Sequence, residues 1–422
     1  MISIITATHN PKWLQQAWAS IDSQNFWDWE WIICPNNGAV VSEVAFGSPQ
    51  VHVVQVPDGL KGIGAIKKFA FSQGRGDILL ELDHDDELLP GALAEVAQAF
   101  QRPEVGFVYS EAVHEGPFVP FDPRCGWVMG EVEYRDQKLP VPLAFEPSAA
   151  SLSRIWYAPD HLRAWRRTVY EALGGHDAKL PVCDDHELLC RTYLATEMVH
   201  IPKPLYLFRI TGENSQKSPE RNKDIQEHTV LIGDEYLELL VQRWADLHGL
   251  PKIDLGGAFD CPPGYQALDV QDAPIIWDVE RRHRLPFPDN SIGIIRAHDF
   301  LEHITDKQMM MREIHRVLVD GGWLLSLTPS TDGRGAWQDP THVSFWNTNA
   351  MWYWTRPQQA RYIRNTDVHF QDFVLKTEFP SDWHRENNIP YVRASLAAVK
   401  SDARRPHLNL WLAPRIQTVS GV

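Results

Sequence analysis

Three carboxylates follow directly on an apolar run, in the sequence Asp77-Ile-Leu-Leu-Glu-Leu-Asp83-His84-Asp85-Asp86. Acidic triplets arise by chance, but the carboxyl end of a buried strand is where an α/β sheet meets its ligands. Carboxylate oxygens are the ligands that Mg²⁺ and Mn²⁺ prefer, and these ions bind phosphates jointly with a protein. We therefore predict a metal site at Asp83 and Asp85, where the cation would neutralise a diphosphate leaving group. The alternative is a solvated loop or a helix cap, and Asp86 fits that alternative.

The elements that would position these carboxylates are visible in the first quarter of the sequence. Residues 2–110 alternate short apolar runs with helical patterns, which is typical of a mainly parallel sheet covered by helices. The apolar runs are ISIIT, WEWIIC, VHVVQV, DILLEL and VGFVYS. After the first run, Asn10 and Pro11 predict a helix N-cap followed by Pro at the first helical position. We expect functional residues just beyond the ends of these runs.

A second alternating pattern begins near residue 252 and predicts a second α/β unit. Its candidate strands are IDLGG, ALDV, IIWDV, IGIIRAH and WLLSLTP. A helical stretch over about 219–249 precedes it and ends at Gly249. A chain of 422 residues is long for one core, so we predict two α/β domains. The predicted parts are residues 1–215, a helical connector at 216–250, and residues 251–422.

Composition limits the function and the location. The formal net charge of −15 argues against an electrostatic grip on nucleic acid or on an anionic membrane. The five Cys form no CxxC pair, which predicts reduced thiols and a cytoplasmic location. The sequence begins with the strand-like MISIIT and shows no charged leader. No apolar stretch approaches the ~20 residues of a spanning helix, so we expect no transmembrane segment.

Four segments of the first domain resemble, in the expected order, the motifs of family 2 glycosyltransferases with the GT-A fold. They are ISIITATHNPKWLQQAWASIDSQ, GIGAIKKFAFSQGRGDILLELDHDD, RRTVYEALGGHDAKLPVCDDHELLCR and HIPKPLYLFRITGENSQ. The resemblance implies inverting transfer of a sugar from a nucleotide-sugar donor to a hydroxyl, with Mn²⁺ or Mg²⁺ as cofactor. It leaves open whether the acceptor is a glycan, a lipid-linked saccharide or a protein.

The resemblance also implies roles for single positions. Asp83 corresponds to a residue that contacts ribose or metal, and Asp85 to the principal metal ligand. Asp185 corresponds to the base that takes the acceptor proton, and Asp184 to a neighbour that raises its pKa or binds acceptor. Otherwise one of this pair caps the following helix. The positions expected to face the donor are Thr6, Thr8, Asn10, Asn36, Asn37, Lys67, Asp83 and Arg209.

Some of these positions carry a second interpretation. Asn36 and Asn37 occupy places where the family usually has acidic residues that contact the base, so the base of the donor stays open. Lys67 pairs with phosphate in one interpretation and lies on a solvated helix face in the other. Thr211 occupies a place where the family often has His.

The second domain resembles class I methyltransferases that use S-adenosylmethionine, which have a Rossmann-like fold. The resemblance rests on IDLGGAFDCPPGYQALDV, LPFPDNSIGIIRAHDFLEHI, MMREIHRVLVDGGWLLSLTPS and DPTHVSFWN. It implies a cofactor site built from a glycine turn, acids near the ribose and adenine, and a His at the methyl-transfer mouth: Gly256, Gly257, Asp269, Asp278 and His298. Ala258 stands where the usual motif has glycine, so a scaffolding or acceptor-recognition role stays open beside methyl transfer.

We therefore expect a metal-dependent inverting glycosyltransferase, with methyl transfer as a second activity to be tested. Three alternatives stay open. A nucleotidyltransferase would release pyrophosphate, and a methyltransferase with a merely sugar-binding N-terminal domain would not need Asp85. A non-catalytic module for polysaccharide assembly would bind neither donor nor cofactor.

Overall fold

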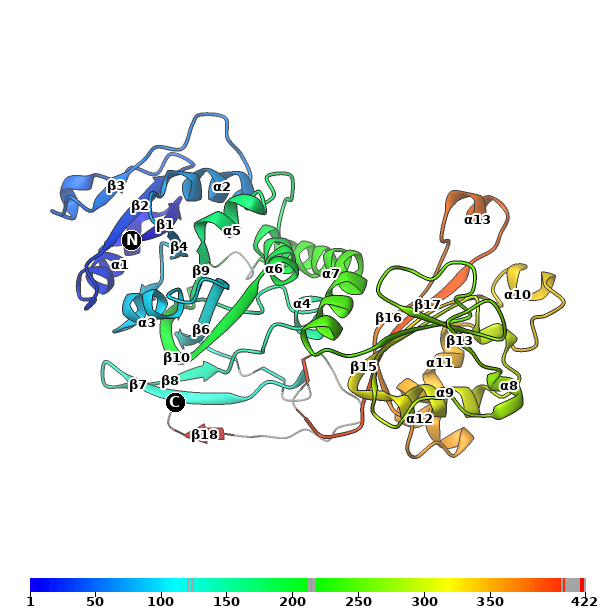
Figure 1. The fold of residues 1–422 in the computed structure, drawn as a ribbon. Coiled ribbons are helices and arrows are strands. Elements are labelled where there is room, and N and C mark those ends of the chain that lie inside the picture. The colour runs from blue at the N-terminus through cyan, green and yellow to red at the C-terminus, as the bar shows by residue number, and fades with distance from the viewer. Residues whose placement is uncertain are drawn as a thin grey trace. The chain divides into compact units, whose positions relative to one another are not determined.

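The computed structural model describes residues 1–119, 121–122, 125–211, 214, 218–403, 405–406 and 418–420. Contacts within the chain define two compact units, residues 1–240 with 415–422 and residues 241–414. Each unit combines a sheet with helices, as the sequence predicts (Figure 1). The predicted boundary at 215 and 216 lies outside the described residues. Helix α7 (Pro219–Leu247) lies inside the stretch predicted as a helical connector.

An eight-stranded sheet forms the centre of the N-terminal unit. In spatial order its strands are β3 (Val51–Val53), β2 (Trp29–Pro35), β1 (Ile2–Thr8), β4 (Ile78–Glu81), β9 (Arg163–Arg166), β6 (Val105–Glu115), β10 (Glu197–Arg209) and β5 (Glu87–Leu88). The first four are parallel, whereas β9 runs antiparallel to both of its neighbours. All five apolar runs predicted as strands in this unit form strands. The strand β9 comes from a stretch with no regular pattern.

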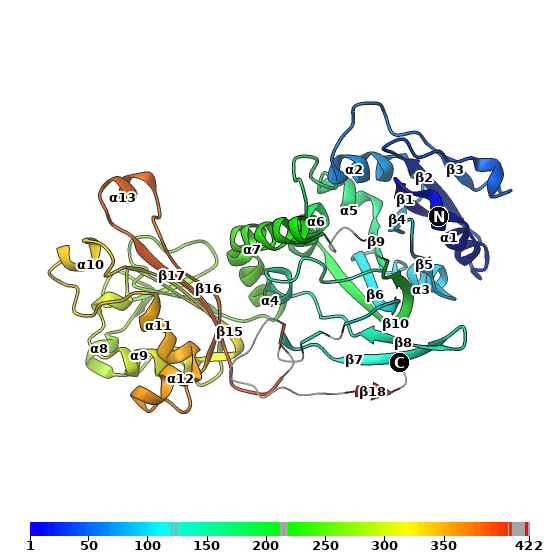
Figure 2. The same ribbon diagram turned by 180° about the vertical axis from the view of Figure 1, so that it is seen from behind.

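Helices cover both faces of this sheet (Figure 2). On one face, α1 (Leu14–Asp22) and α3 (Ala92–Ala99) bury Ile21 and Val96 in one core cluster with Ile4 of β1. The other face packs against α2 (Ile63–Gln73), α5 (Arg167–Ala172) and α6 (Asp184–Ala195). There Phe71 of α2 packs edge-on against Trp165 of β9. Burial of both faces explains why these strands are apolar throughout.

Smaller elements complete the unit. A short helix, α4 (Ala149–Leu152), precedes β9 in the chain. A separate three-stranded sheet has the order β18 (Thr418–Ser420), β7 (Met129–Tyr134) and β8 (Gln137–Pro142), with β18 and β7 parallel.

The C-terminal unit contains a seven-stranded sheet. Its order is β13 (Ile275–Ile276), β12 (Gln266–Asp269), β11 (Lys252–Leu255), β14 (Ile292–His298), β15 (Leu318–Pro329), β17 (Tyr391–Ala398) and β16 (Phe370–Glu378). The first five are parallel and correspond to the five predicted runs, and the last two are antiparallel. The α-helices are α8 (Val279–Arg282), α9 (Lys307–Val317), α10 (Gly335–Gln338), α11 (Thr348–Thr355), α12 (Pro357–Ala360) and α13 (Asp382–Glu386).

Strand register brings charged residues together at one edge of the N-terminal sheet. Glu81, the last residue of β4, pairs with Arg163, the first residue of β9. On the other side of β4, Glu81 lies opposite Ile5 of β1. Asp83 follows two positions beyond the end of β4. This edge is the one at which the sequence places the functional carboxylates.

A glycine allows α2 to approach the start of α6. A Cβ atom on Gly64 would lie 2.3 Å from the carbonyl oxygen of Asp177 and 3.0 Å from Cβ of Asp184. The first distance is shorter than any real contact of a Cβ atom, so only glycine fits without a backbone shift. The close approach places Lys67, one turn further along α2, beside the carboxylates at the sheet edge.

Replacing Gly64 by Ala should therefore destabilise the N-terminal unit, although alanine is the better helix former. Overpacking of this kind costs about 1–3 kcal/mol. In a unit of this size each kcal/mol lowers the melting temperature by about 2–4 °C. Thermal unfolding followed by circular dichroism tests this, with Lys68→Ala at an exposed position of the same helix as control. Equal melting temperatures for Gly64→Ala and the wild type would contradict the close approach.

Candidate functional site

A cavity of about 280 Å³ lies in the N-terminal unit at the edge where β4 and β9 meet. Part of its lining is charged or polar: Lys67, Asp83, Asp160, His161, Arg163, Asp184, Asp185 and Arg221. The rest includes an aromatic wall, formed by Phe121, Trp156, Tyr157 and Phe208. Most ligand sites combine an apolar surface with a few convergent polar groups, and this cavity has that composition.

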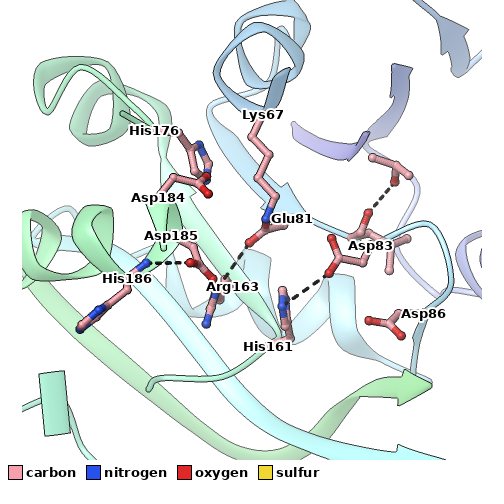
Figure 3. Close-up of polar contacts among 12 residues, drawn as sticks. Lys67, Glu81, Asp83, Asp86, His161, Arg163, His176, Asp184, Asp185 and His186 are labelled. Atoms are coloured by element: carbon pink, nitrogen blue, oxygen red, sulfur yellow. Dashed lines mark hydrogen bonds and ion pairs between the residues drawn. The ribbon is translucent and has the colours of Figure 1, made fainter. Parts of the chain in front are cut away.

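Glu81 lies buried between two cations beside this cavity (Figure 3). Lys67 Nζ donates a hydrogen bond of 2.5 Å to Oε1, and Arg163 Nη1 lies 3.9 Å from Oε2. Burial alone would lower the pKa of Lys67, but the charges of Glu81 and of nearby aspartates raise it. Burial would likewise raise the pKa of Glu81, and the charge of Lys67 lowers it instead. Both groups therefore stay ionised inside the protein.

Asp185 is bound to the same arginine. Its Oδ2 accepts a hydrogen bond of 2.7 Å from Arg163 Nη1, and its Oδ1 accepts one of 2.9 Å from the backbone N–H of His186. Burial would raise the pKa of Asp185, but the charges of Arg163 and Lys67 lower it. Asp185 is therefore a carboxylate held in one orientation at the cavity wall.

Asp184 has the opposite electrostatic environment. Within the described part of the chain its buried Oδ2 has no hydrogen-bond partner. Burial raises the pKa of Asp184 to about 7; Lys67 opposes the rise, and the charges of Asp185 and Glu81 add to it. Neither aspartate is the helix cap that was the alternative interpretation. The N-cap of α6 is Cys183, which has a φ of 60° and makes no side-chain capping bond.

The loop after β4 separates its carboxylates into two kinds. Asp86 is buried and accepts hydrogen bonds of 2.8 Å from the Tyr206 hydroxyl and from the backbone N–H of Arg209, so it anchors β10. Asp83 is more exposed, and its Oδ2 lies 3.8 Å from His161 Nε2. Burial and the charge of Asp83 raise the pKa of Asp85.

Several residues expected at the donor lie within the body of the unit. Thr6 has no exposed surface, and its hydroxyl donates to the carbonyl of Leu82, which ties β1 to the end of β4. The hydroxyl of Thr8 accepts from the backbone N–H of Asn10. Asn10 itself accepts from the N–H of Lys12, which confirms the predicted N-cap.

The two asparagines after β2 differ in exposure. Asn36 is buried and its backbone N–H donates to the carbonyl of Thr8, so the loops after β1 and β2 lie together. Asn37 is exposed and has a φ of 51°, a conformation that asparagine tolerates better than most residues.

The N–H groups of Arg209 are directed to protein atoms. Its guanidinium forms ion pairs with Glu87 at 2.5 Å and with Glu115 at 2.9 Å, and it also donates to the carbonyl of Asp85. It lies over the ring of Trp13, 4.5 Å from the ring centroid. Arg209 thus positions the backbone at Asp85.

Three residues of this site do not follow from the sequence motifs. Glu81 and Arg163 form the charge network, and His161 stacks on Tyr206 with 4.8 Å between ring centroids. A charged residue inside an apolar run is the signal that marks Glu81. Arg163 has no such signal, because its strand comes from a stretch without regular alternation.

In the C-terminal unit the glycine turn after β11 packs closely against neighbouring side chains. Gly256 has a φ of 80°, and a Cβ atom on Gly257 would lie 2.4 Å from Oδ2 of Asp254. The backbone N–H of Ala258 donates to Oδ2 of Asp269 at 3.3 Å. The turn after β11 and the acid at the end of β12 are therefore joined by a hydrogen bond.

The other two positions expected at the cofactor have local contacts. Asp278 is the N-cap of α8 and accepts from the backbone N–H of Arg281 at 2.9 Å. His298 ends β14, with Nδ1 2.8 Å from Nη2 of Arg296. Burial and the charge of Arg296 lower the pKa of His298 to about 3, so this imidazole is neutral at physiological pH.

Comparison with known families identifies one domain in each unit. Residues 3–173 match the family model described as Glycosyl transferase family 2. The chain carries a glycosyltransferase domain. Residues 266–326 match the family model described as Methyltransferase domain, so the C-terminal unit carries that second domain. The two resemblances drawn from the sequence motifs are confirmed.

A curated relative of the chain is the O-antigen biosynthesis protein RfbC of Myxococcus xanthus. The two sequences are 27% identical over 240 residues, which are 54% of this chain and 17% of RfbC. The chain therefore spans less than a fifth of the length of that relative.

Solved structures with a similar arrangement include residues 1–349 of S. aureus TarS, with a TM-score of 0.41 and 17% identity over 58% of this chain and 72% of that chain. Another is the mannosyltransferase PcManGT from Pyrobaculum calidifontis in complex with GDP-Man and Mn²⁺, with a TM-score of 0.37 and 15% identity over 59% of this chain and 75% of that chain. Because both TM-scores are below 0.5, the assignment of the two domains rests on the family models and not on these solved structures. Among the helices of the described ranges, none is long and apolar enough to cross a membrane.

The raised pKa of Asp184 predicts how the stability of the glycosyltransferase domain depends on pH. An acid with a higher pKa in the folded state stabilises the fold while it is protonated. That stability is complete below the unfolded value near 4 and is lost as the pH rises through about 7. Asp184→Asn keeps a neutral side chain at every pH. Its melting temperature minus that of the wild type should therefore increase from pH 4 to pH 7 and stay constant above pH 7. Between these two pH values the free energy of unfolding of the wild type, relative to the variant, should fall by at most about 1.4 kcal/mol per pH unit.

Thermal unfolding of both proteins at half-unit steps from pH 4.5 to 8.5 measures this difference. Asp58→Asn, at an exposed position, controls for the substitution itself. A difference between Asp184→Asn and the wild type that is constant across this range would show that Asp184 does not carry the proton.

Proposed function

We propose that the N-terminal unit transfers a sugar from a nucleotide-sugar donor to a hydroxyl acceptor, with inversion and with the help of Mn²⁺ or Mg²⁺. The observation that carries the proposal is the cavity of this glycosyltransferase domain, which joins Asp83 to the pair Asp184 and Asp185. Asp83, proposed to act at the donor phosphates, and Asp185, proposed to take the acceptor proton, thus line one cavity of about 280 Å³.

The residues after β4 fit a divalent cation. Asp83 and Asp85 offer carboxylate oxygens, which are the ligands of Mg²⁺ and Mn²⁺. Their mutual repulsion contributes to the raised pKa of Asp85, and a cation bound by both would offset it. The carbonyl of Asp85, held by Arg209, fixes the backbone of this loop. The bound ion would supply positive charge to the departing nucleoside diphosphate.

Asp185 is the proposed base. It is ionised, and its bond to Arg163 aims it along the cavity wall. An inverting transfer needs such a carboxylate to take the proton of the acceptor hydroxyl as its oxygen attacks the anomeric carbon. Asp184, with its pKa near 7, is the rival for this role, because a base works best when its pKa is close to the working pH.

The acceptor is proposed to be a carbohydrate. The cavity has an aromatic wall that includes Trp156, Tyr157 and Phe208, and flat aromatic rings pack well against the apolar faces of sugar rings. The relative RfbC is described as an O-antigen biosynthesis protein, which agrees with a glycan acceptor. The cytoplasmic location predicted from the cysteine pattern belongs to the same proposal, and all five Cys are free thiols.

Metal-dependent donor binding provides the first test. A nucleotide sugar that binds the folded protein raises its melting temperature in a concentration-dependent way. Among UDP-, GDP- and dTDP-sugars tested with Mn²⁺, we expect a shift that EDTA abolishes and that Asp85→Ala loses. Asp77→Ala, whose side chain is 87% exposed, is the matched control and should keep the shift. A full shift in Asp85→Ala would exclude Asp85 as a ligand of the metal.

Transfer kinetics provide the second test. Asp185→Asn should lower kcat by about 10²–10⁴-fold, the range that general-base catalysis contributes, while donor binding stays unchanged. Asp184→Asn should cost far less. Product analysis in the same assay distinguishes sugar transfer, which releases nucleoside diphosphate, from nucleotidyl transfer, which releases pyrophosphate. Full turnover by Asp185→Asn together with an inactive Asp184→Asn would move the role of base to Asp184.

A second activity, methyl transfer, is proposed for the C-terminal unit. The glycine turn at Gly256 and Gly257 and the carboxylate of Asp269 support a site for S-adenosylmethionine, since the turn and the acid lie side by side at the ends of two adjacent strands. The bound cofactor would supply an electrophilic methyl group. The neutral His298 lies at the end of β14, next to β11 and its glycine turn.

A further inference from the structure

Glu302, His303 and His342 come together in the C-terminal unit from two separate segments. The first two belong to a short 3-10 helix, Leu301–His303, that follows β14. The carbonyl oxygen of Glu302 accepts hydrogen bonds of 2.9 Å from the backbone N–H groups of Val343 and Ser344. These two bonds attach the segment that carries His342 to the helix that carries Glu302 and His303.

Both imidazoles are oriented by backbone carbonyls. His303 Nδ1 lies 3.1 Å from the carbonyl oxygen of Thr341, and His342 Nδ1 lies 3.3 Å from that of Ala336. A carbonyl oxygen only accepts, so each Nδ1 carries a proton, and in the neutral imidazole each Nε2 is then free to bind a metal.

The carboxylate of Glu302 points into the same space without a donor. Glu302 is 1% exposed, and within the described residues neither of its carboxylate oxygens has a hydrogen-bond partner. Its Oε1 lies 4.0 Å from Nε2 of His342. A buried carboxylate without donors is costly, and facing lone pairs add to that cost. The carboxyl group of Asp299 also lies close to Glu302, so a cation in the space between the three side chains would offset the repulsion there.

The three ligand atoms lie within 4.8 Å of one another. Around a tetrahedral ion with bonds of about 2.1 Å, the ligand atoms lie about 3.4 Å apart. The side chains therefore need to close by at most about 1.4 Å, which side-chain rotation can supply. Two imidazoles and one carboxylate are the ligand types that suit Zn²⁺, Mn²⁺, Fe²⁺ and Co²⁺. Histidine ligands that donate their other N–H to a carbonyl are the usual arrangement around such ions.

We propose that Glu302, His303 and His342 bind a divalent transition-metal ion in the C-terminal unit. This site differs from the pair Asp83 and Asp85 in position and in ligand chemistry, because it includes nitrogen ligands. Three protein ligands leave at least one coordination position open for an oxygen atom of a substrate.

The surroundings indicate what that substrate oxygen belongs to. Phe300 packs against the glycine turn, since a Cβ atom on Gly256 would lie 3.1 Å from its ring. Phe300, which contacts the proposed cofactor turn, is thus only two positions before Glu302, a proposed metal ligand. Trp337 and Phe345, from the same segment as His342, form an exposed stacked pair with 4.3 Å between ring centroids. A sugar hydroxyl is the ligand that suits this combination, an assignment that rests on the proposed methyl transfer.

The test is a titration of the full chain with Co²⁺ alone, without nucleotide or S-adenosylmethionine. The parent protein carries Asp83→Asn and Asp85→Asn, so that the carboxylate site of the other unit does not contribute. Co²⁺ bound by two imidazoles and a carboxylate gives visible d–d absorption. We expect one equivalent to bind, and Glu302→Gln and His342→Gln each to weaken binding at least tenfold. The matched controls are Glu386→Gln and His283→Asn, at exposed positions of the same unit, which should bind as the parent does.

Two results would overturn the proposal: no d–d band in the parent, or the same affinity in Glu302→Gln and His342→Gln as in the parent. Circular dichroism checks that each variant folds, and His303→Gln, at a partly exposed position, decides the question if Glu302→Gln does not fold. Because the titration contains no sugar nucleotide and lacks the carboxylates of the other site, its failure would leave the sugar-transfer proposal intact.

Discussion

The geometry of the glycosyltransferase cavity depends on one buried charge network. Lys67 and Arg163 face three carboxylates, Glu81, Asp184 and Asp185, in a space that water hardly reaches. Two cations compensate two of these acids, and the direct bonds show which: Glu81 binds Lys67, and Asp185 binds Arg163. Asp184 is the uncompensated acid, so its pKa rises. Two cations for three acids thus explain why two of the carboxylates stay ionised and the third has a raised pKa.

The same network couples the fold to the chemistry. Breaking a buried ion pair by removing one member costs about 3–5 kcal/mol, because the other charge stays buried without compensation. The pairing of Glu81 with Arg163 across β4 and β9 therefore favours one strand register, and that register carries Asp83 to the cavity. The approach of α2 at Gly64 brings Lys67 into the same network. Residues that stabilise the domain are in this way also the residues that set the pKa values of its candidate base.

In both units the candidate ligand-binding groups lie at the same edge of the sheet. In both, the candidate groups follow the carboxyl ends of parallel strands, where the strands end and loops provide side chains and free backbone groups. The N-terminal unit places hard oxygen ligands there, at Asp83 and Asp85. The C-terminal unit places a glycine turn after β11 and, after β14, a glutamate with two histidines. A nucleotide-sugar site and a nitrogen-containing metal site would therefore occupy equivalent edges of two unlike sheets.

The sequence by itself determined the class of both folds and the place of the main carboxylates. Apolar runs such as ISIIT and IGIIRAH predict strands because a strand buried on both faces must be apolar throughout, and this is a local property. Asp83 and Asp85 could be found because they directly follow such a run, and Asp184 and Asp185 because their segment resembles a family motif. Only the tertiary structure decided which charges meet. Arg163 binds a residue 22 positions away, and Arg209 binds one 122 positions away. The first pair forms where α6 meets the start of β9, and the second forms through the pairing of β10 with β5. No local pattern in the sequence specifies either contact.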